Sequence, residues 1–259
     1  MRLAFLLIAL TSCTSAYEKE LDAFHAERTK EISAEWVTLV ARMQLSEGDN
    51  AIVIPGYDGV LGTLNVTGSA LTWNGAAISD DSKGEPTIFE HGSLRMHVIT
   101  RGALHFLRVK DLEAPALKKF AGLSWYPAAT KWKLSGTFEP AAPDATIEIT
   151  NVLNQTAPQK SPGSVRFDVD GKTWRLIAIA DDEPGFFLVF KDETSGHGTY
   201  PAGRFLHTSA PSADGSVTVD FNRAYSPPCA YTKFATCPLP PKGNALALKI
   251  EAGERGEAH

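Results

Sequence analysis

The sequence shows no strong excess of either charge, with 25 Lys and Arg against 30 Asp and Glu and a formal net charge of −5. This balance argues against a nucleic-acid partner, which would favour a basic face. Runs of like charge long enough for a polyanion-binding arm are missing, and so is an internal repeat. With 43% apolar residues, the 259-residue chain can bury a sizeable core, as one large β domain or as two small ones.

Long apolar runs are also missing near the N-terminus, where residues 3–10 form a run too short to span a bilayer. This run follows Arg2, and the two features together predict an export signal over residues 1–16. The small residues that end at Ala16 fit an ordinary cleavage site.

Cys13 offers a second interpretation of the same segment. Thr11-Ser12-Cys13 resembles a bacterial lipobox, in which the cysteine is lipidated and becomes the first residue of the mature protein. Both interpretations predict export, and the lipobox adds a membrane attachment through a lipid at Cys13. The next residue, Thr14, is not the aspartate linked to inner-membrane retention, so we expect the cell envelope at the outer membrane or periplasm.

Only residues 17–46 have a clear helical pattern. We interpret this segment as an N-terminal amphipathic helix, stopped near Gly48, that docks on a sheet. Its apolar residues recur at helical spacing between charged ones: Leu21, Phe24, Ile32, Trp36, Leu39, Val40 and Met43.

From residue 50 onward the pattern changes to about a dozen short apolar runs, which end with residues 245–250. Asn74-Gly75 and Asp170-Gly171 are dipeptides typical of hairpin turns. Because no helices alternate with these runs, a parallel βαβ fold is disfavoured. We predict a mainly β fold, an antiparallel barrel or sandwich behind the N-terminal helix.

Proline-containing stretches near residues 140–143 and 155–163 are candidate boundaries within this β region. They suggest a helix over 17–48, a first β subdomain over 49–142, a second over 143–254, and a short tail over 255–259. A single β domain is the alternative.

Residues 192–241 carry the features that point to a site. Two strand-like runs, 203–207 and 216–222, flank Asp214-Gly215 and predict a hairpin. The segment after it, through residue 241, is irregular and rich in proline. Such long loops in compact domains usually either carry a function or are disordered. The aromatic residues and cysteines here argue against disorder.

The predicted hairpin would bring several polar side chains together under this loop: Tyr200, Arg204, Asp220, Asn222 and Arg223. Two guanidinium groups in one place can clamp a carboxylate or phosphate. This predicts a small polar or anionic ligand. The alternative is a structural salt bridge between Arg204 and Asp220.

Cys229 and Cys237 lie within the same loop. In an exported protein a disulfide is the expected state of such a pair. The alternative is a metal site, although the spacing matches no standard zinc motif and only His197 and His207 lie nearby in sequence. We therefore predict a disulfide and no metal, and the sequence does not tell whether the protein has a cofactor.

Residues 192–197 offer a candidate nucleophile. Ser195 and His197 stand close in sequence, but Glu193 occupies the first glycine position of the nucleophile-elbow pattern. A turn whose hydroxyls cap backbone amides is the competing interpretation. Asp192 and Asp220 are the candidate acid–base pair, each of which also fits a turn-capping role.

Several stretches resemble the bacterial and archaeal DUF1684 family. They include FAGLSWYP at 120–127, SPGSVRF at 161–167, TYPAGRFL at 199–206, and DFNRAYSPPCAYTKFATCPLPP with NALALKIEAGE after it. The resemblance covers roughly residues 30–254 and implies no particular activity. Ser226 departs from the family's more typical Tyr-Asn-Pro-Pro, and His197 is not a histidine position of the family.

We therefore predict an exported lipoprotein that binds a small polar or anionic ligand under the 222–241 loop. One alternative is a hydrolase that uses Asp192, Ser195, Asp220 or Arg223 on a small-molecule or envelope substrate. The other is a structural or assembly lipoprotein.

Overall fold

The computed structural model describes residues 15–180 and 184–256, apart from the side chain of Lys83. The predicted lipidation site Cys13 and most of the predicted signal segment therefore lie outside the described residues. Within the described ranges, no helix is both long enough and apolar enough to cross a membrane.

The N-terminal helix, α1 (Ala16–Glu31), begins at a capping box. The Ser15 hydroxyl accepts a hydrogen bond from the Glu18 N–H, and the Glu18 carboxylate accepts one from the Ser15 N–H. A π-helical turn, Ile32–Val37, continues the helix.

The prediction that this helix continues to residue 46 is wrong, because residues 39–44 form strand β1 (Leu39–Gln44). Leu39 and Ala41 are buried, and β1 pairs with β8 in an antiparallel ladder. The apolar residues of β1 fitted a helical period by coincidence, and pairing with a distant strand overrode that local pattern.

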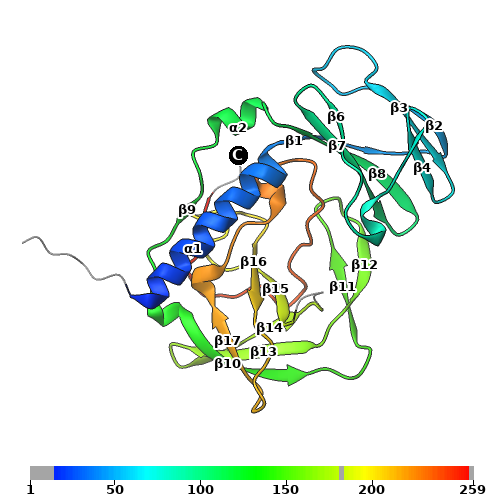
Figure 1. The fold of residues 1–259 in the computed structure, drawn as a ribbon. Coiled ribbons are helices and arrows are strands. Elements are labelled where there is room, and N and C mark those ends of the chain that lie inside the picture. Colours follow the sequence, from blue (N-terminus) through cyan, green and yellow to red (C-terminus); the bar gives the residue numbers. More distant parts are fainter. Residues whose placement is uncertain (1–14, 181–183, 257–259) are drawn as a thin grey trace, which may run out of the picture.

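The first β unit consists of two four-stranded sheets that pack face to face (Figure 1). One has the order β2-β3-β4-β5: β2 (Gly48–Ile52), β3 (Gly62–Thr67), β4 (Ala70–Trp73) and β5 (Ala76–Ile78). The other has the order β1-β8-β7-β6: β6 (Phe89–His91), β7 (Leu94–Arg101) and β8 (Leu104–Asp111). Leu64, Met96 and Leu107, all fully buried, lie in the core between them.

The second unit is built on a four-stranded sheet of order β14-β13-β10-β17. Its strands are β10 (Lys133–Pro140), β13 (Gly163–Val169), β14 (Lys172–Ala178) and β17 (Ser216–Asp220). The pair β15 (Phe186–Phe190) and β16 (Arg204–Thr208) covers its apolar face and closes a core around Phe167, Phe190 and Phe221.

Smaller elements complete this unit. They are helix α2 (Pro115–Lys119), the pair β11 (Thr146–Thr150) and β12 (Thr156–Lys160), and the pair β9 (Ser124–Trp125) and β18 (Glu254–Arg255). Single 3₁₀ turns cover Thr130–Trp132, Phe221–Arg223 and Pro228–Ala230; another, Asp81–Lys83, lies beside β7 in the first unit. In Figure 1, α1 lies across this unit, where Phe24 meets the Trp125 ring edge to face. The fold is thus mainly β, antiparallel and sandwich-like behind an N-terminal helix, with no closed barrel among the described residues.

Two of the three predicted hairpins are confirmed. Asn74-Gly75 joins β4 to β5 and Asp170-Gly171 joins β13 to β14, with positive φ at all four residues. The third prediction is wrong. Asp214-Gly215 does form a turn, but β16 pairs with β15 and β17 pairs with β10. The connection between β16 and β17 is long enough for the chain to leave one sheet and join another.

Two further segments differ from the predictions. Residues 245–250 form no regular strand; they make one parallel bridge and a few hydrogen bonds with residues 191–193. Strand β10, which we assigned to the first β subdomain, pairs with β13 and β17 of the second unit. The prolines near residue 140 therefore mark a turn after β10.

Candidate functional site

Arg204 lies in the core of the second unit, where its side chain contacts Asp192 and not Asp220. It is 0% exposed and pairs with Asp192, with Nη2 and Oδ1 3.2 Å apart. Its guanidinium also donates to the backbone carbonyls of Ile250 and Ala252. The expected pairing of Arg204 with Asp220 is therefore wrong, because β16 does not pair with β17.

Asp220, Asn222 and Arg223 do converge, but on the start of α1. Both carboxylate oxygens of Asp220 accept from the Tyr17 hydroxyl at 2.8 Å, and Asn222 bonds the backbone N–H and C=O of Ala129. Arg223 lies 3.6 Å from Asp220 and is partly exposed. These bonds attach α1 and the 127–129 segment to the second unit, which is a structural role.

Ser195 and Asp192 form a capped turn. The Ser195 hydroxyl accepts from the Asp192 N–H at 3.2 Å, and the Ser195 backbone pairs with Thr199. His197 at the tip of this turn is exposed. This geometry matches the turn-capping interpretation, and Asp192 is held by the buried Arg204.

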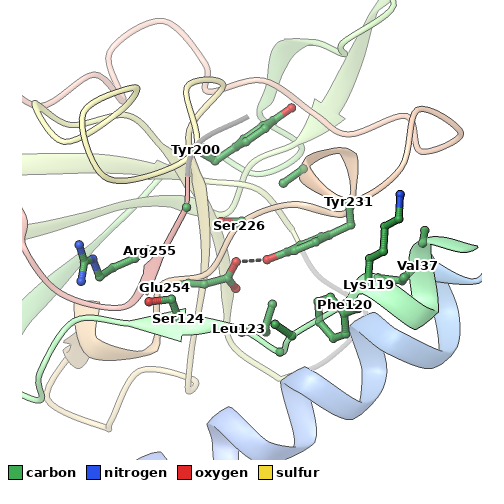
Figure 2. A pocket seen from close by; sticks show the side chains of 15 residues that line it. Val37, Lys119, Phe120, Leu123, Ser124, Tyr200, Ser226, Tyr231, Glu254 and Arg255 are labelled. Carbon is green, nitrogen blue, oxygen red and sulfur yellow. Dashed lines mark hydrogen bonds between the residues drawn. The ribbon is translucent and has the colours of Figure 1, made fainter. Parts of the chain in front are cut away.

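Tyr200 is the one predicted residue that faces a cavity. A pocket of about 540 Å³ lies between the α2–β9 segment, the loop around residues 226–231 and strand β18. Figure 2 shows Tyr200 and Tyr231 on one side and Phe120 and Leu123 on the other. A volume of this size is typical of sites for small molecules.

Glu254 lies in this pocket and is 1% exposed. It points toward Tyr231, whose hydroxyl donates to Oε1 (Figure 2). Burial raises the pKa of the Glu254 carboxyl, while hydrogen bonds from Tyr231 and from the side chain and N–H of Ser226, together with the charge of Arg28, act in the opposite direction.

Gly253 explains how Glu254 reaches this position. Its φ of +77° is one that L side chains rarely adopt, and a Cβ there would lie 2.4 Å from the Ala224 carbonyl oxygen. The Glu254 N–H then donates to that same carbonyl, and Glu254 pairs with Trp125 of β9. The glycine therefore lets the backbone turn closely against the loop, so that the next side chain enters the pocket.

Two basic side chains, Lys119 and Arg255, lie at the rim of the pocket, and both are exposed. Glu254 is the pocket's only acidic lining residue among those described. Arg28, just behind the pocket, is engaged elsewhere: its guanidinium bonds Glu31 and the Ser226 carbonyl and stacks on the Tyr225 ring. The formal charge around the cavity is thus positive when Glu254 is protonated.

Cys229 and Cys237 touch each other but are free thiols in this structure, so the predicted disulfide is not formed. The Cys229 N–H lies 3.2 Å from Cys237 Sγ. The pKa of Cys229 is lowered to about 7, chiefly by a hydrogen bond from the Cys237 thiol, and burial together with that bond raises the pKa of Cys237. The Tyr200 hydroxyl donates to the Cys229 carbonyl, which connects this pair to the pocket wall.

In the described ranges, no three His, Cys, Asp or Glu side chains are grouped so as to hold a metal ion. His207, which we considered as a metal ligand, instead hydrogen-bonds the Tyr225 hydroxyl and stacks on Phe187.

The sequence analysis missed Glu254, Tyr231, Lys119 and Arg255, which come from three separate segments. One signal was available in the sequence. The mostly apolar segment 245–252 is followed directly by a glycine and a glutamate, Gly253 and Glu254. A charged residue directly after a glycine at that place fits a close backbone turn that aims one polar group inward.

A family model described as "Protein of unknown function (DUF1684)" matches residues 118–255, just over half of the chain. Among solved structures, the chain is similar to the solution NMR structure of the uncharacterized protein from gene locus rrnAC0354 of Haloarcula marismortui. The two are 31% identical, with 54% of this chain and 78% of that chain covered and a TM-score of 0.45. The comparison with curated proteins gives no match.

Proposed function

This chain belongs to the DUF1684 family, and from that premise we propose that it is an exported envelope lipoprotein that binds a small ligand in the pocket beneath the 222–241 loop. The ligand has an apolar body and one polar or anionic group. The observation that carries this proposal is the cavity itself, about 540 Å³ in volume, with the buried carboxyl of Glu254 among its lining side chains.

The pocket walls support an apolar body for the ligand. Val37, Phe120 and Leu123 line the cavity and are buried or half-buried. Apolar walls with a few convergent polar groups are typical of small-molecule sites. The basic rim formed by Lys119 and Arg255 favours a ligand with negative charge.

A filled pocket tests this proposal. Ala116 lines the cavity from α2 and is exposed, so Ala116→Trp fills the space without opening the core. We expect thermal-shift screening with small carboxylates and neutral amphiphiles to raise the Tm of the wild type and not of Ala116→Trp. Ala142→Trp, on an exposed turn away from the pocket, is the matched control and should respond like the wild type. Equal shifts in all three proteins would contradict binding in this pocket.

Export and anchoring rest on the N-terminal segment. An apolar run ends at Leu10, two residues separate it from Cys13, and α1 begins at Ala16. Labelling with a fatty-acid analogue in a bacterial host should tag the wild type and not Cys13→Ser. Equal labelling of both proteins would contradict the anchor.

In the exported protein we expect Cys229 and Cys237 to be oxidised to a disulfide, because the two residues are already in contact. Free-thiol counting on unreduced protein recovered from the periplasm should then find neither thiol reactive. Two reactive thiols in that protein would contradict the disulfide.

Acid catalysis is a second candidate, favoured by the raised pKa of Glu254 inside a cavity. In a hydrolase of this kind Glu254 would be the proton donor. Hydrolysis of p-nitrophenyl esters by the wild type, lost in Glu254→Gln, would support it; equal rates in the two proteins would exclude that role for Glu254.

A further inference from the structure

Two arginines stand opposite each other on the outer face of the first β unit. Arg42 of β1 is the cross-strand partner of Arg108 of β8, and His97 of β7 is the partner of Arg108 on its other side. The residues that alternate with them, such as Leu107 and Val109, are buried in the core, so these three side chains lie on the opposite face. Like charges directly opposite each other destabilise a sheet. The arginine pair is therefore costly unless an opposite charge lies near both.

The other basic side chains of β7 and β8 already have acidic partners: Lys110 pairs with Glu35, Arg95 with Glu90 and Arg101 with Asp81. Within the described ranges, Arg42 and Arg108 form no salt bridge. The charges of Glu35 and Asp81 do act on Arg108, but each of these carboxylates is bonded to a different base. Burial, followed by the charges of Arg108 and Lys110, lowers the pKa of His97 to about 4, so His97 is uncharged. Two positive charges thus remain without a partner.

Arg108 also has a hydrogen-bond donor without an acceptor. Its guanidinium carbon lies 4.6 Å from the ring centre of Trp36, and its Nη2 is buried with no hydrogen-bond partner among the described residues. The indole Nε1 of Trp36 is likewise buried without a partner there. Both atoms can only donate. Stacking on the indole stabilises the charge of Arg108 but supplies no acceptor, so two neighbouring buried donors are left unsatisfied.

Arg42 adds further donors on the solvent side of this pair. Its Nη1 donates to the Thr236 hydroxyl at 3.0 Å, an exposed bond, and its guanidinium carbon lies 5.5 Å from the centre of the Phe106 ring. A guanidinium has five N–H groups, so this single bond leaves most of them available. Arg42 and Arg108 are both half-buried, and a small anion can therefore approach them from solvent.

We propose that Arg42 and Arg108 bind a phosphate group, either free or as a monoester. Such a group carries close to two negative charges at neutral pH, which matches the two unpaired guanidinium groups. Its oxygens supply acceptors for Arg42, for Nη2 of Arg108 and for Nε1 of Trp36, and arginine binds phosphate in a bidentate geometry. A carboxylate has one charge and two oxygens, so it leaves part of the site unsatisfied. None of these three residues lines the pocket beneath the 222–241 loop, so this is a second site.

Calorimetric titration of the full chain with inorganic phosphate and with acetate, at constant ionic strength, tests the proposal. Phosphate should bind about tenfold more tightly than acetate or better, because it gains at least one more charge-assisted hydrogen bond. Arg42→Gln and Arg108→Gln should each weaken phosphate binding by about tenfold or more.

Arg95→Gln is the matched control. It removes one positive charge from the same face of the same sheet, but a charge that Glu90 already pairs, so it should bind phosphate like the wild type. Melting curves without phosphate establish that each variant is folded. If Arg108→Gln does not fold, Arg42→Gln decides the matter alone, because the Arg42 side chain lies at the surface of the sheet and bonds only Thr236.

Vesicles separate two sources of the phosphate group. Flotation uses the full chain with Cys13→Ser, which removes the predicted lipid anchor, and vesicles of phosphatidylcholine with or without phosphatidic acid. Capture only by the phosphatidic acid vesicles, lost when Arg42→Gln is added, assigns the phosphate to a lipid head group. Binding of inorganic phosphate without capture assigns it to a soluble compound.

Three results would overturn the proposal: no binding of phosphate to the wild type, binding of acetate as tight as that of phosphate, or an equal loss in Arg95→Gln and Arg42→Gln. Ala116→Trp, which fills the pocket, should leave phosphate binding unchanged. A loss in Ala116→Trp but not in Arg42→Gln would place the phosphate at the basic rim of the pocket and would also overturn the proposal.

Discussion

Asp192 and Glu254 are both buried carboxyl groups, 7% and 1% exposed, yet their surroundings are opposite. Asp192 is paired with Arg204, and its oxygens also accept from Thr194 and from the Ile250 N–H. Glu254 accepts hydrogen bonds from Tyr231 and Ser226 and forms no salt bridge among the described residues. A buried carboxylate paired with a buried arginine is typical of a scaffold, whereas a buried carboxyl of raised pKa beside a cavity is typical of a site. The difference teaches that burial of a charged residue does not by itself identify function.

The largest expected effect on stability comes from a change to the ion pair of Asp192. Arg204→Ala leaves the Asp192 carboxylate buried without its cation and should lower the free energy of unfolding by about 3–5 kcal/mol. Urea unfolding followed by tryptophan fluorescence measures it. The double variant Asp192→Leu/Arg204→Met, which removes both charges, should recover most of the loss. A loss below about 1 kcal/mol for Arg204→Ala would contradict the scaffold role.

An intermediate effect is expected from Asn222, which is buried and bonds Ala129, Tyr17 and Asp220. Asn222→Ala removes these bonds and leaves the N–H and C=O of Ala129 without hydrogen-bond partners. The free energy of unfolding should therefore fall by about 2 kcal/mol. Tyr17→Phe gives the comparison: it removes the bonds of the Tyr17 hydroxyl to Asn222 and Asp220 but leaves both backbone groups of Ala129 paired, so it should cost less. Equal losses would show that the attachment of α1 depends on the Tyr17 hydroxyl alone.

Removing the side chain of Arg223, in contrast to that of Arg204, should have a small effect on stability. It is 34% exposed, and its contacts with Asp220 and Glu20 are 3.6 and 3.5 Å long. Exposed pairs of this kind contribute at most about 1 kcal/mol. Arg223→Ala should therefore unfold within about 1 kcal/mol of the wild type, and a loss as large as that of Arg204→Ala would place Arg223 in the scaffold as well.

The smallest effect on stability at neutral pH is expected on the Glu254 side, because Glu254→Gln keeps the shape of the side chain and an oxygen that accepts from Tyr231. The pH dependence should differ. Because the folded-state pKa of Glu254 lies above the unfolded value of about 4.3, its contribution to stability is full below that value and is lost as pH rises through the folded pKa.

Melting temperatures of the wild type and Glu254→Gln across that window provide the measurement. The advantage of the wild type over the variant should shrink with rising pH and then level off. Parallel curves would show that Glu254 titrates with the same pKa in the folded and unfolded chain.

The hairpins at Asn74-Gly75 and Asp170-Gly171 were predictable because their backbone angles are a local property of those dipeptides. The same local reasoning failed for the strands that flank Asp214-Gly215. A turn dipeptide fixes the direction of the chain over a few residues, but it does not choose the neighbouring strand when the connection is long. The predicted site depended on the wrong strand pairing, which placed Arg204 beside Asp220.

The sequence by itself determined the mainly β class, two of the hairpins and the family resemblance, because each depends on residues close together in the chain. Only the tertiary structure decided where the helix ends, that Arg204 belongs to the core, and that Glu254 meets Tyr231 in a cavity. These features depend on contacts between segments far apart in sequence. Such contacts do not produce a recognisable residue pattern within any one segment.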